Sequence, residues 1–486
     1  MNYKVVLSIL GKAMLIEAAL MLVPLLVGVY FSEDTYLSFL IPMAGLFAIG
    51  APLSSLKSKD GSIYAKEGFV IVALAWVVLS VVGCVPFIVS GEIKGFADAL
   101  FETASGFTTT GASVLDGEQV EGMAKSVMFW RILTHWLGGM GVLVFILAVL
   151  PNVGAGLMYV FRAESPGPSS GKLVGKMRHT ARILYGIYVV LTMAEALLLL
   201  FGGMNLYDSV LTAFSTAGTG GFGVHDGSIA YYESVYVEMV VAAFMFLFGI
   251  NFNIFYLILT GNILKALKSE ELLVYVVIIV VASITVALNI LFTLDGINNF
   301  WQAMRYSFFQ VNTVSSTTGF STANFAEWPA LSKGILLFLT VIGASGGSTG
   351  GGMKVARLCI LAHSAKANIR RMIYPRVVVS VKFEGKTISQ ETERGVLTYL
   401  VLYVAIACTC TLLLSFDVGD VFDNFSATLA CISNVGPGIT NMVGPMSSYA
   451  AYSGLSKTIL TFVMLAGRLE IFPIIILFVP RTWKKG

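Results

Sequence analysis

Four short stretches of the sequence combine a glycine with neutral oxygen-bearing side chains, which are the residue types that bind a dehydrated cation. The glycines recur at intervals of about one hundred residues, and Thr or Asn stands two positions before each. The stretches are DALFETASGFTTTGA, DSVLTAFSTAGTGGF, YSFFQVNTVSSTTGF and DNFSATLACISNVGP, aligned on Gly111, Gly221, Gly319 and Gly436. A fourfold repeat of this kind indicates one site assembled from four similar parts.

Each stretch predicts a short helix of about nine residues whose C-terminal, negative end points at the glycine. An aspartate at the start of three of them, Asp98, Asp208 and Asp423, fits an N-cap. Tyr306 stands at this position in the third stretch, so we expect that helix to begin earlier, near Asn298 or Asn299.

The segment after each short helix predicts an extended strand that lines a pore. Glycine permits left-handed dihedral angles and lets successive carbonyls turn toward a common axis. Neutral oxygens favour a large monovalent cation such as potassium, because a divalent ion requires carboxylates. The predicted filter residues are Thr109, Thr110, Gly111, Thr219, Gly220, Gly221, Thr317, Thr318, Gly319, Asn434, Val435 and Gly436.

A second candidate is the glycine-rich stretch GASGGSTGGGMK, residues 343–354, which follows an apolar run over 331–342. Met353 before Lys354, Val355 after it and the preceding helix all disfavour a phosphate-binding loop. A helix kink for packing is one alternative. The preferred interpretation is an irregular gate loop inside the membrane, formed by Gly343, Gly346, Gly347, Ser348, Thr349, Gly350, Gly351 and Gly352.

Arg468 lies about twelve residues into the last apolar segment, where a cation usually faces a cavity or a partner. It either bonds carbonyls or a carboxylate structurally, or it raises the barrier to a permeating cation. Glu470 lies on a different helical face, so the two do not form a local pair. Lys354 either assists Arg468 or extends to the cytoplasmic surface.

The composition identifies an integral membrane protein, because 56% of the 486 residues are hydrophobic and only 12% are charged. The mean hydropathy is +0.83. The net charge of +3 does not indicate nucleic acid, and the five cysteines and four histidines have no metal-ligand spacing. No nucleophile or metal constellation supports an enzyme, and we expect no organic cofactor in this chain.

The apolar segments predict an all-α protein with ten transmembrane helices. They lie near 8–31, 36–55, 68–90, 127–150, 182–203, 235–261, 272–294, 331–361, 396–416 and 456–480. Lys and Arg concentrate in the loops on the side of the N-terminus, so both termini are expected in the cytoplasm.

The first two spans precede four pairs of spans, and each pair flanks one of the glycine stretches. This predicts two N-terminal helices and four pseudo-repeats of helix, re-entrant pore helix with filter strand, and helix around one pore. The expected boundaries are 1–60 for the N-terminal helices and 61–165, 166–268, 269–378 and 379–486 for the pore repeats, with the gate loop in the third.

Several motifs together resemble the Trk/Ktr/HKT superfamily of potassium transporters, and within it the TrkH branch. They are ASGFTTTGAS, STAGTGGFGVHDGS, SSTTGFST, SNVGPG, RILTHWLGGMGVLV and LAGRLEIFPIIILF. The second repeat departs from the pattern, with Gly220 before Gly221 and Gly223 after Phe222.

The resemblance implies potassium (K+) uptake across the bacterial cytoplasmic membrane by a homodimer embedded in membrane lipid. It also implies a gate at the glycine-rich loop with Arg468 beside it, and a cytosolic TrkA-type nucleotide-binding ring as regulator. A docking surface for such a ring is one interpretation of the cytoplasmic loops that bear Arg162, Lys172, Lys176, Arg178, Arg370 and Arg371, and the positive-inside rule alone is the other. Passive conduction is the first expectation, and potassium symport coupled to sodium or protons is the alternative.

Overall fold

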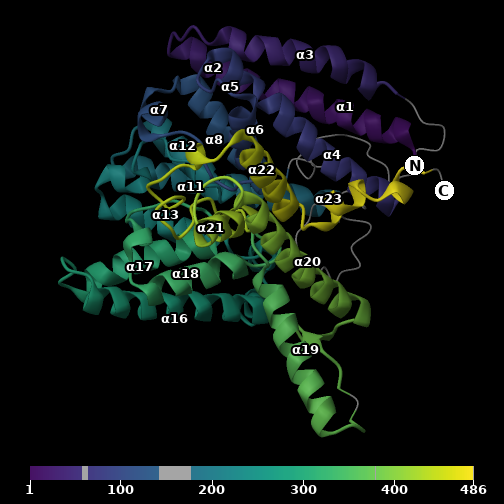
Figure 1. Ribbon diagram of the computed structural model, residues 1–486, viewed down its shortest axis with the longest axis vertical. Helices are drawn as coiled ribbons and strands as arrows, with labels where there is room; N and C mark the ends of the chain where they lie inside the picture. Colours follow the sequence, from purple (N-terminus) through teal and green to yellow (C-terminus); the bar gives the residue numbers. More distant parts are fainter. Residues whose placement is uncertain (57–63, 142–176, 378, 485–486) are drawn as a thin grey trace.

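The structure is a computed structural model that describes residues 1–56, 64–141, 177–377 and 379–484. The protein is helical, and its N- and C-terminal segments lie side by side (Figure 1). The Tyr3 hydroxyl donates to the Trp483 carbonyl oxygen at 2.5 Å, which joins the two segments.

The first helices form a pair at one edge of the molecule. They are α1 (Tyr3–Leu20), its continuation α2 (Leu22–Tyr30) and α3 (Tyr36–Ser54). An ideal Cβ on Gly11 would lie 2.8 Å from the Gly50 carbonyl oxygen, so the backbones of α1 and α3 approach closely. Small residues commonly permit such packing in membranes.

The remaining helices follow in four successive groups. The first holds α4 (Ala65–Gly83), α5 (Val85–Ser90), α6 (Phe96–Phe107), α7 (Gly117–Gly122) and α8 (Lys125–Gly139). The second holds α11 (Met177–Phe201), α12 (Leu206–Gly218), η1 (Ser228–Tyr232), α13 (Val235–Phe248), α14 (Phe252–Leu259) and α15 (Ile263–Leu267).

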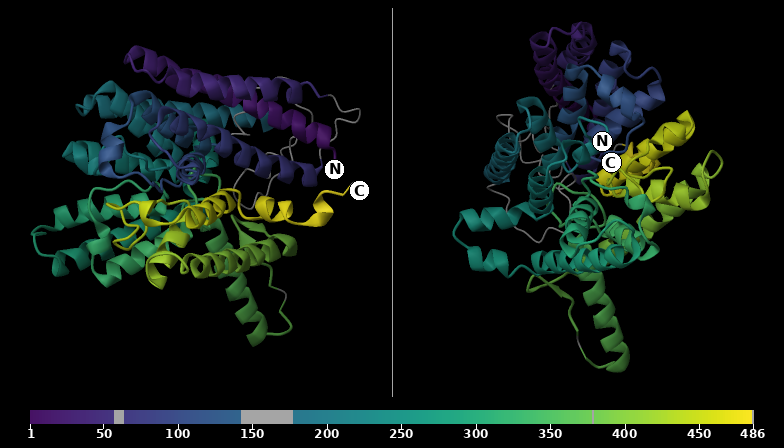
Figure 2. Two further views of the ribbon diagram at one scale, coloured as in Figure 1. Left: turned by 45° about the horizontal axis from the view of Figure 1, so that its top comes forward. Right: turned by 90° about the vertical axis from the view of Figure 1, so that its left-hand side faces the viewer.

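The third group holds α16 (Glu270–Thr293), α17 (Phe300–Ser315), η2 (Phe325–Glu327), α18 (Ala330–Ile342) and α19 (Val355–Ile373). The fourth holds α20 (Gln390–Leu414), α21 (Val421–Ile432), η3 (Tyr449–Ala451), α22 (Gly454–Arg468), α23 (Phe472–Leu477) and η4 (Pro480–Thr482). Between them, β1 (Lys382–Phe383) and β2 (Lys386–Thr387) pair antiparallel, with Lys382 opposite Thr387. The end of α19 projects from the body of the molecule (Figures 1 and 2).

Six helical segments among the described residues are long and apolar enough to cross a membrane, or seven if one bent pair is counted as a single span. They are Tyr3–Tyr30, Tyr36–Ser54, Lys66–Ser90, Ala181–Phe201, Glu270–Thr293 and Gln390–Leu414. Each coincides with a predicted span. The chain is therefore an all-helical protein with several membrane spans.

Besides the span over 331–361, which is broken between α18 and α19 as the run of glycines predicted, two predicted spans are not continuous helices. The span expected over 235–261 is bent by 88° between α13 and α14. The last span is interrupted between α22 and α23, where Glu470 and Ile471 have φ of 55° and 69° and Pro473 follows in the first turn of α23. Proline near a helix start lacks an N–H to continue the preceding helix, which favours a break here. Residues 142–150 of the span expected over 127–150 lie outside the described residues.

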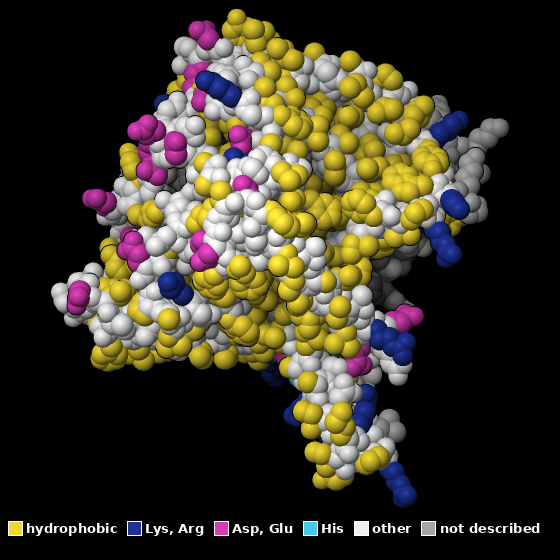
Figure 3. All heavy atoms as spheres, in the orientation of Figure 1, with side chains coloured by type: hydrophobic (Ala, Val, Ile, Leu, Met, Phe, Trp, Pro, Cys, Tyr) yellow, Lys and Arg dark blue, Asp and Glu magenta, His cyan; other side chains and the backbone are white. Residues whose placement is uncertain are grey.

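Acidic and basic side chains lie at opposite edges of the molecule. In Figure 3 carboxylates gather at the edge near α7, and most Lys and Arg gather at the opposite edge near the termini and along α19. A broad band of hydrophobic side chains separates these edges. This distribution follows the positive-inside pattern expected from the sequence.

The four short helices are α6, α12, α17 and α21, and they are longer than predicted, at 12, 13, 16 and 12 residues. The expectation that Asp98, Asp208 and Asp423 are N-caps is wrong. The cap positions belong to Gly95, Asn205 and Asp420, and each aspartate is the third helical residue. A carboxylate in the first turn still faces free N–H groups there, which is why the pattern suggested a cap. The early start of the third helix is confirmed, because Asn299 caps α17.

Candidate functional site

The four short helices end in the same way. The residue two positions before each aligned glycine has left-handed backbone dihedrals, with φ of 54° at Thr109, 54° at Thr219, 61° at Thr317 and 55° at Asn434. A β-branched residue rarely adopts this conformation, because its Cβ crowds the backbone. Strained dihedrals that recur at four equivalent places are typical of a functional site.

Backbone hydrogen bonds at these ends also repeat. In each, the N–H one residue before the glycine donates to the carbonyl five residues earlier: Thr110 to Ser105 at 2.9 Å, Gly220 to Ser215 at 2.9 Å, Thr318 to Thr313 at 2.8 Å and Val435 to Ala430 at 2.9 Å. Each left-handed residue donates to the carbonyl three residues earlier. This is the Schellman arrangement, which usually has glycine at the left-handed position. It ends each helix and turns the chain into the following strand with the same hydrogen bonds at all four places.

The four glycines form a closed ring. An ideal Cβ on Gly111 would lie 1.9 Å from the carbonyl oxygen of Gly220, and one on Gly221 would lie 2.1 Å from that of Thr318. The series continues with 2.3 Å from Gly319 to Val435 and returns with 2.6 Å from Gly436 to Thr110. In every case the neighbouring oxygen belongs to the residue just before the next glycine. The strands therefore surround one axis in chain order, and no side chain fits at the glycine positions.

Several hydroxyl groups of these strands are engaged by protein. Thr110 Oγ1 contacts Thr108 Oγ1 at 2.8 Å and accepts from Asn434 Nδ2 at 2.9 Å, which links the first and fourth strands. Thr318 Oγ1 contacts Ser316 Oγ at 2.7 Å, and Thr219 Oγ1 donates to the Gly218 carbonyl at 2.6 Å. Among the described residues, Thr109 Oγ1 and Asn434 Oδ1 are buried without a partner, so the oxygens left for a ligand are backbone carbonyls together with these two.

A hollow of about 130 Å³ opens on the ring. All four glycines line it, together with residues of the loops that follow the strands. Among its charged lining residues are Asp116, Asp226 and Arg131, and Arg131 is paired with Glu102 at 2.7 Å. This hollow is a vestibule that leads to the ring from the edge at which carboxylates gather.

The glycine-rich loop lies against the other side of the ring. An ideal Cβ on Gly350 would lie 2.7 Å from the Ser316 carbonyl oxygen, and one on Gly351 would lie 2.2 Å from that of Ser433. The Gly351 N–H donates to Thr317 Oγ1 at 2.6 Å, which joins the loop directly to the strand that follows α17. The predicted break between Gly343 and Gly352 is confirmed, since α18 ends at Ile342 and α19 begins at Val355.

Other contacts hold the remaining part of the loop. Glu271, buried in the first turn of α16, accepts from the Gly346 N–H at 2.5 Å and from Asn251 Nδ2 at 3.2 Å. The Gly347 carbonyl accepts from the Phe252 N–H at 3.0 Å, and Ser348 Oγ donates within the loop to Ser345. Gly343, Gly347 and Gly352 have φ of 68°, 74° and 75°, which favours glycine at these turns.

Arg468 connects the loop to the first group of helices. Its guanidinium donates to the Thr349 carbonyl at 2.7 Å and to the Gly138 and Gly139 carbonyls at 2.5 and 2.7 Å. Gly138 itself packs at the end of α6, where an ideal Cβ would lie 1.9 Å from the Phe107 carbonyl oxygen. The Arg468 side chain therefore lies beside the ring. It bonds the fourth group of helices to the glycine-rich loop in the third group and to the end of α8 in the first.

Two further cations lie near Arg468. Lys354 is 3% exposed and its Nζ donates to the Gly350 carbonyl, so the alternative that it extends to the cytoplasmic surface is wrong. Arg357 pairs with Glu470 at 2.5 Å and lies 4.1 Å from the centre of the Tyr399 ring. Glu470 thus pairs with α19, and because it lies beyond the end of α22 the argument from helical faces does not apply to it.

The structure brings all the predicted filter and gate residues to one place, but sequence reasoning missed Glu102, Arg131, His135 and Glu271. Arg131 and His135 contact the second strand at Gly223 and Phe222, and Glu102 pairs with Arg131. Arg131 and His135 stand one helical turn apart in an apolar segment, and the rule that singled out Arg468 would also have found them.

Two other features lie apart from the ring. Arg162, Lys172 and Lys176 lie outside the described residues, as does the side chain of Arg178, whereas Arg370 and Arg371 lie exposed on the projecting α19.

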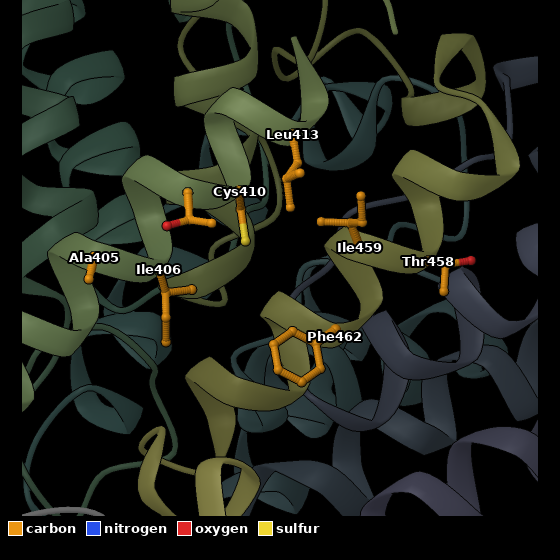
Figure 4. Close-up of a pocket in the computed structure, with 8 residues that line it drawn as sticks. Ala405, Ile406, Cys410, Leu413, Thr458, Ile459 and Phe462 are labelled. Carbon is orange, nitrogen blue, oxygen red and sulfur yellow. The ribbon is translucent and has the colours of Figure 1, made fainter. Parts of the chain in front are cut away.

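A groove of about 460 Å³ between α20 and α22 is lined by uncharged residues such as Ile406, Leu413 and Phe462 (Figure 4). It supplies no charged ligand. The described residues contain no group of three or more His, Cys, Asp or Glu suited to a metal.

Comparison with known proteins gives matches over the whole chain. The family described as TrkH, cation transport protein, matches residues 38–485. The chain is 32% identical over 488 residues to the Trk system potassium uptake protein TrkH of Escherichia coli (strain K12), covering 100% of both chains. It is 31% identical over 491 residues to the Trk system potassium uptake protein TrkG of the same organism, covering 99% of each.

A solved structure matches at the same length. The crystal structure of the potassium transporter TrkH from Vibrio parahaemolyticus superimposes with a TM-score of 0.89 at 30% sequence identity, covering 100% of both chains. The fold described above is therefore that of a known transporter.

Proposed function

Because the chain belongs to the TrkH family of cation transport proteins, which are transporters and not enzymes, we propose that it takes up potassium through a channel-like pore. The chain matches the Escherichia coli relatives over essentially their full length, and both relatives are named as potassium uptake proteins. The observation that carries the proposal is the closed ring in which each glycine faces the carbonyl before the next glycine.

The pore consists of four quasi-equivalent quarters of one chain, preceded by two N-terminal helices, with ten membrane crossings in total. The quarters span 61–165, 166–268, 269–378 and 379–486. The repeated left-handed residues and helix-end hydrogen bonds support this division, because four copies of a strained conformation require four copies of the same surroundings.

Selectivity comes from the backbone oxygens of the four strands over residues 109–111, 219–221, 317–319 and 434–436. Their carbonyls replace the water shell of a potassium ion, and the negative ends of α6, α12, α17 and α21 lower the energy of a cation on the axis. No carboxylate belongs to these twelve residues, which favours a monovalent ion over a divalent one.

The glycine-rich loop is the gate, and Arg468 is part of the barrier. The loop lies across the inner ends of the third and fourth short helices, and Arg468 bonds it to the end of α8. A guanidinium beside the path repels potassium. Conduction then requires the loop and Arg468 to move together.

The protein works as a homodimer in the bacterial cytoplasmic membrane with both termini in the cytoplasm. A cytosolic nucleotide-binding ring of the TrkA type moves the gate. Membership of a Trk system supports a Trk partner, and the basic residues of α19 offer it a surface on the cytoplasmic side.

The test is ion flux in liposomes that contain the purified protein, with potassium, rubidium and sodium measured separately. We expect flux of potassium and rubidium well above that of sodium, and an increase when the cytosolic ring and its nucleotide are added. Reversal potentials measured in imposed sodium and pH gradients distinguish conduction from symport. A potential that follows only the potassium gradient supports conduction, and one that shifts with sodium or pH supports coupled transport.

A further inference from the structure

Three of the four filter strands are held by a side chain of their own short helix. Glu102 Oε2 accepts from the Val114 N–H at 3.0 Å, and Ser426 Oγ accepts from the Ile439 N–H at 2.8 Å. In the Gln310 amide, the orientation that gives both the oxygen and the nitrogen a partner lets the oxygen accept from the Thr322 N–H at 3.0 Å. In each case the donor lies three residues beyond the aligned glycine.

The second strand is held from another quarter. The Phe222 N–H donates to His135 Nε2 at 3.3 Å, and the Phe222 ring stacks on the imidazole at 4.1 Å between centres. The Arg131 guanidinium lies 3.6 Å from the centre of the same ring and donates to the Gly223 carbonyl at 3.3 Å. Arg131 and His135 both belong to α8, in the first group of helices.

The hydrogen bonds of His135 determine its tautomer. Because Nε2 accepts from a backbone N–H, the proton lies on Nδ1, which donates to the Gly106 carbonyl at 2.7 Å. The imidazole is therefore neutral and uses both nitrogens. It joins the last turn of α6 to the second filter strand.

The same ring explains why the second repeat has an additional glycine. An ideal Cβ on Gly220 would lie 2.2 Å from His135 Cγ. The equivalent positions in the other strands carry the side chains of Thr110, Thr318 and Val435. In the second strand the imidazole occupies this space.

Arg131 is fixed by a buried charge pair. Its Nε donates to Glu102 Oε1 at 2.7 Å, and the two side chains are 3% and 0% exposed. Glu102 also holds the first strand through the Val114 N–H and accepts from Ser113 Oγ. The pair thus links the first strand to the second, and a shift of one is transmitted to the other.

We propose that Arg131 and His135 are positioning residues that set the ion selectivity of the pore by holding the second filter strand from α8. This inference rests on the proposed function of the ring as a potassium filter. A strand released from these contacts moves its carbonyls off the axis, and their fit to potassium over sodium is reduced. Neither residue needs to touch the ion.

The test compares His135→Gln with His135→Phe by measuring the ratio of rubidium to sodium flux in liposomes. Glutamine can still donate to Gly106 and accept from Phe222, whereas phenylalanine fills the space and stacks but offers neither group. We expect His135→Phe to lower the ratio about tenfold, the effect of losing about one hydrogen bond to a buried N–H. His135→Gln should retain most of the wild-type ratio.

The second comparison is Arg131→Met combined with Glu102→Gln, which removes both charges at similar volume and leaves neither unpaired. We expect folded protein with a reduced flux ratio. Trp136→Phe on the same helix, whose ring stacks on Tyr188 and Phe214, is the control and should leave the ratio unchanged.

Equal ratios in wild type and His135→Phe would overturn the proposal, as would equal losses in the two His135 variants. If the double variant does not fold, the His135 pair alone decides. A wild-type protein that conducts neither potassium nor rubidium would instead refute the proposed function, so the two failures are distinguishable.

Discussion

The carbonyl oxygen of Gly220 lies where a side chain on Gly111 would have to begin. An ideal Cβ on Gly111 would be 1.9 Å from that oxygen, which is about half a normal contact distance. The backbones of two different quarters are thus in direct contact, with no room for a side chain between them. Because the same relationship closes around the ring, each strand limits the position of the next.

Gly111→Ala is expected to damage selectivity. The added methyl group must displace the Gly220 carbonyl, and alanine at a φ of 76° costs a further ~1–2 kcal/mol. We expect the ratio of potassium to sodium flux in liposomes to fall about tenfold or more. Gly45→Ala is a matched control, since its ideal Cβ meets nothing within 4 Å in α3. A selective Gly111→Ala protein would argue against the ring as the filter.

Deleting Gly346–Gly350 is expected to raise potassium flux in the absence of any cytosolic partner. The deletion removes the part of the loop that holds Thr349, one of the three carbonyl partners of Arg468. Flux that stays at the wild-type level would reject the loop as a gate.

Arg468→Gln should act in the same direction. The substitution removes the positive charge and weakens bonds of about 1.5–3 kcal/mol each to the Thr349, Gly138 and Gly139 carbonyls. The expected result is an increase in basal potassium flux of about tenfold or more, with selectivity retained. Lys265→Gln, on the surface helix α15, controls for the loss of a positive charge elsewhere. An Arg468→Gln protein with normal or lower flux would contradict the role of Arg468 in the barrier.

Thr317→Val and Thr317→Ser test the contact between the filter and the loop. Serine keeps the hydroxyl that accepts from the Gly351 N–H at 2.6 Å, whereas valine has nearly the same shape as threonine without it. Leaving a buried N–H unsatisfied costs about 1–3 kcal/mol. We therefore expect Thr317→Val, but not Thr317→Ser, to shift gating, measured as flux with and without the cytosolic ring. Identical flux in the two variants would show that this bond does not contribute to gating.

Glu470→Gln is expected to lower thermal stability. It removes the charge that pairs with Arg357, whose side chain is only 7% exposed. Since Glu470 is 22% exposed, the cost should be about 1–3 kcal/mol, below that of a fully buried pair. Thermal unfolding in detergent measures the effect, and Glu327→Gln, at an exposed carboxylate in η2, is the comparison. Equal melting temperatures would mean that the pair contributes little.

Local patterns in the sequence were sufficient for much of the fold. Hydropathy located the spans that the structure contains, and the asparagine before Phe300 located the start of α17. The run of glycines predicted the break after Ile342. The family predicted from the motifs is confirmed by the match over residues 38–485. These features depend on residues close together in the chain, where propensity and periodicity act.

The tertiary structure alone decided which groups meet. Nothing local in the sequence indicates that the Gly220 carbonyl faces Gly111, that Arg468 bonds the end of α8, or that His135 takes the place of a side chain at Gly220. These contacts join residues that are distant in the chain, and their geometry follows from how the helices pack. The 88° bend after Phe248 likewise depends on the surface that the segment meets, whereas Pro473 favours the break after Arg468 locally. The sequence by itself therefore determined that four similar oxygen-bearing stretches exist, and packing decided that they close into one ring.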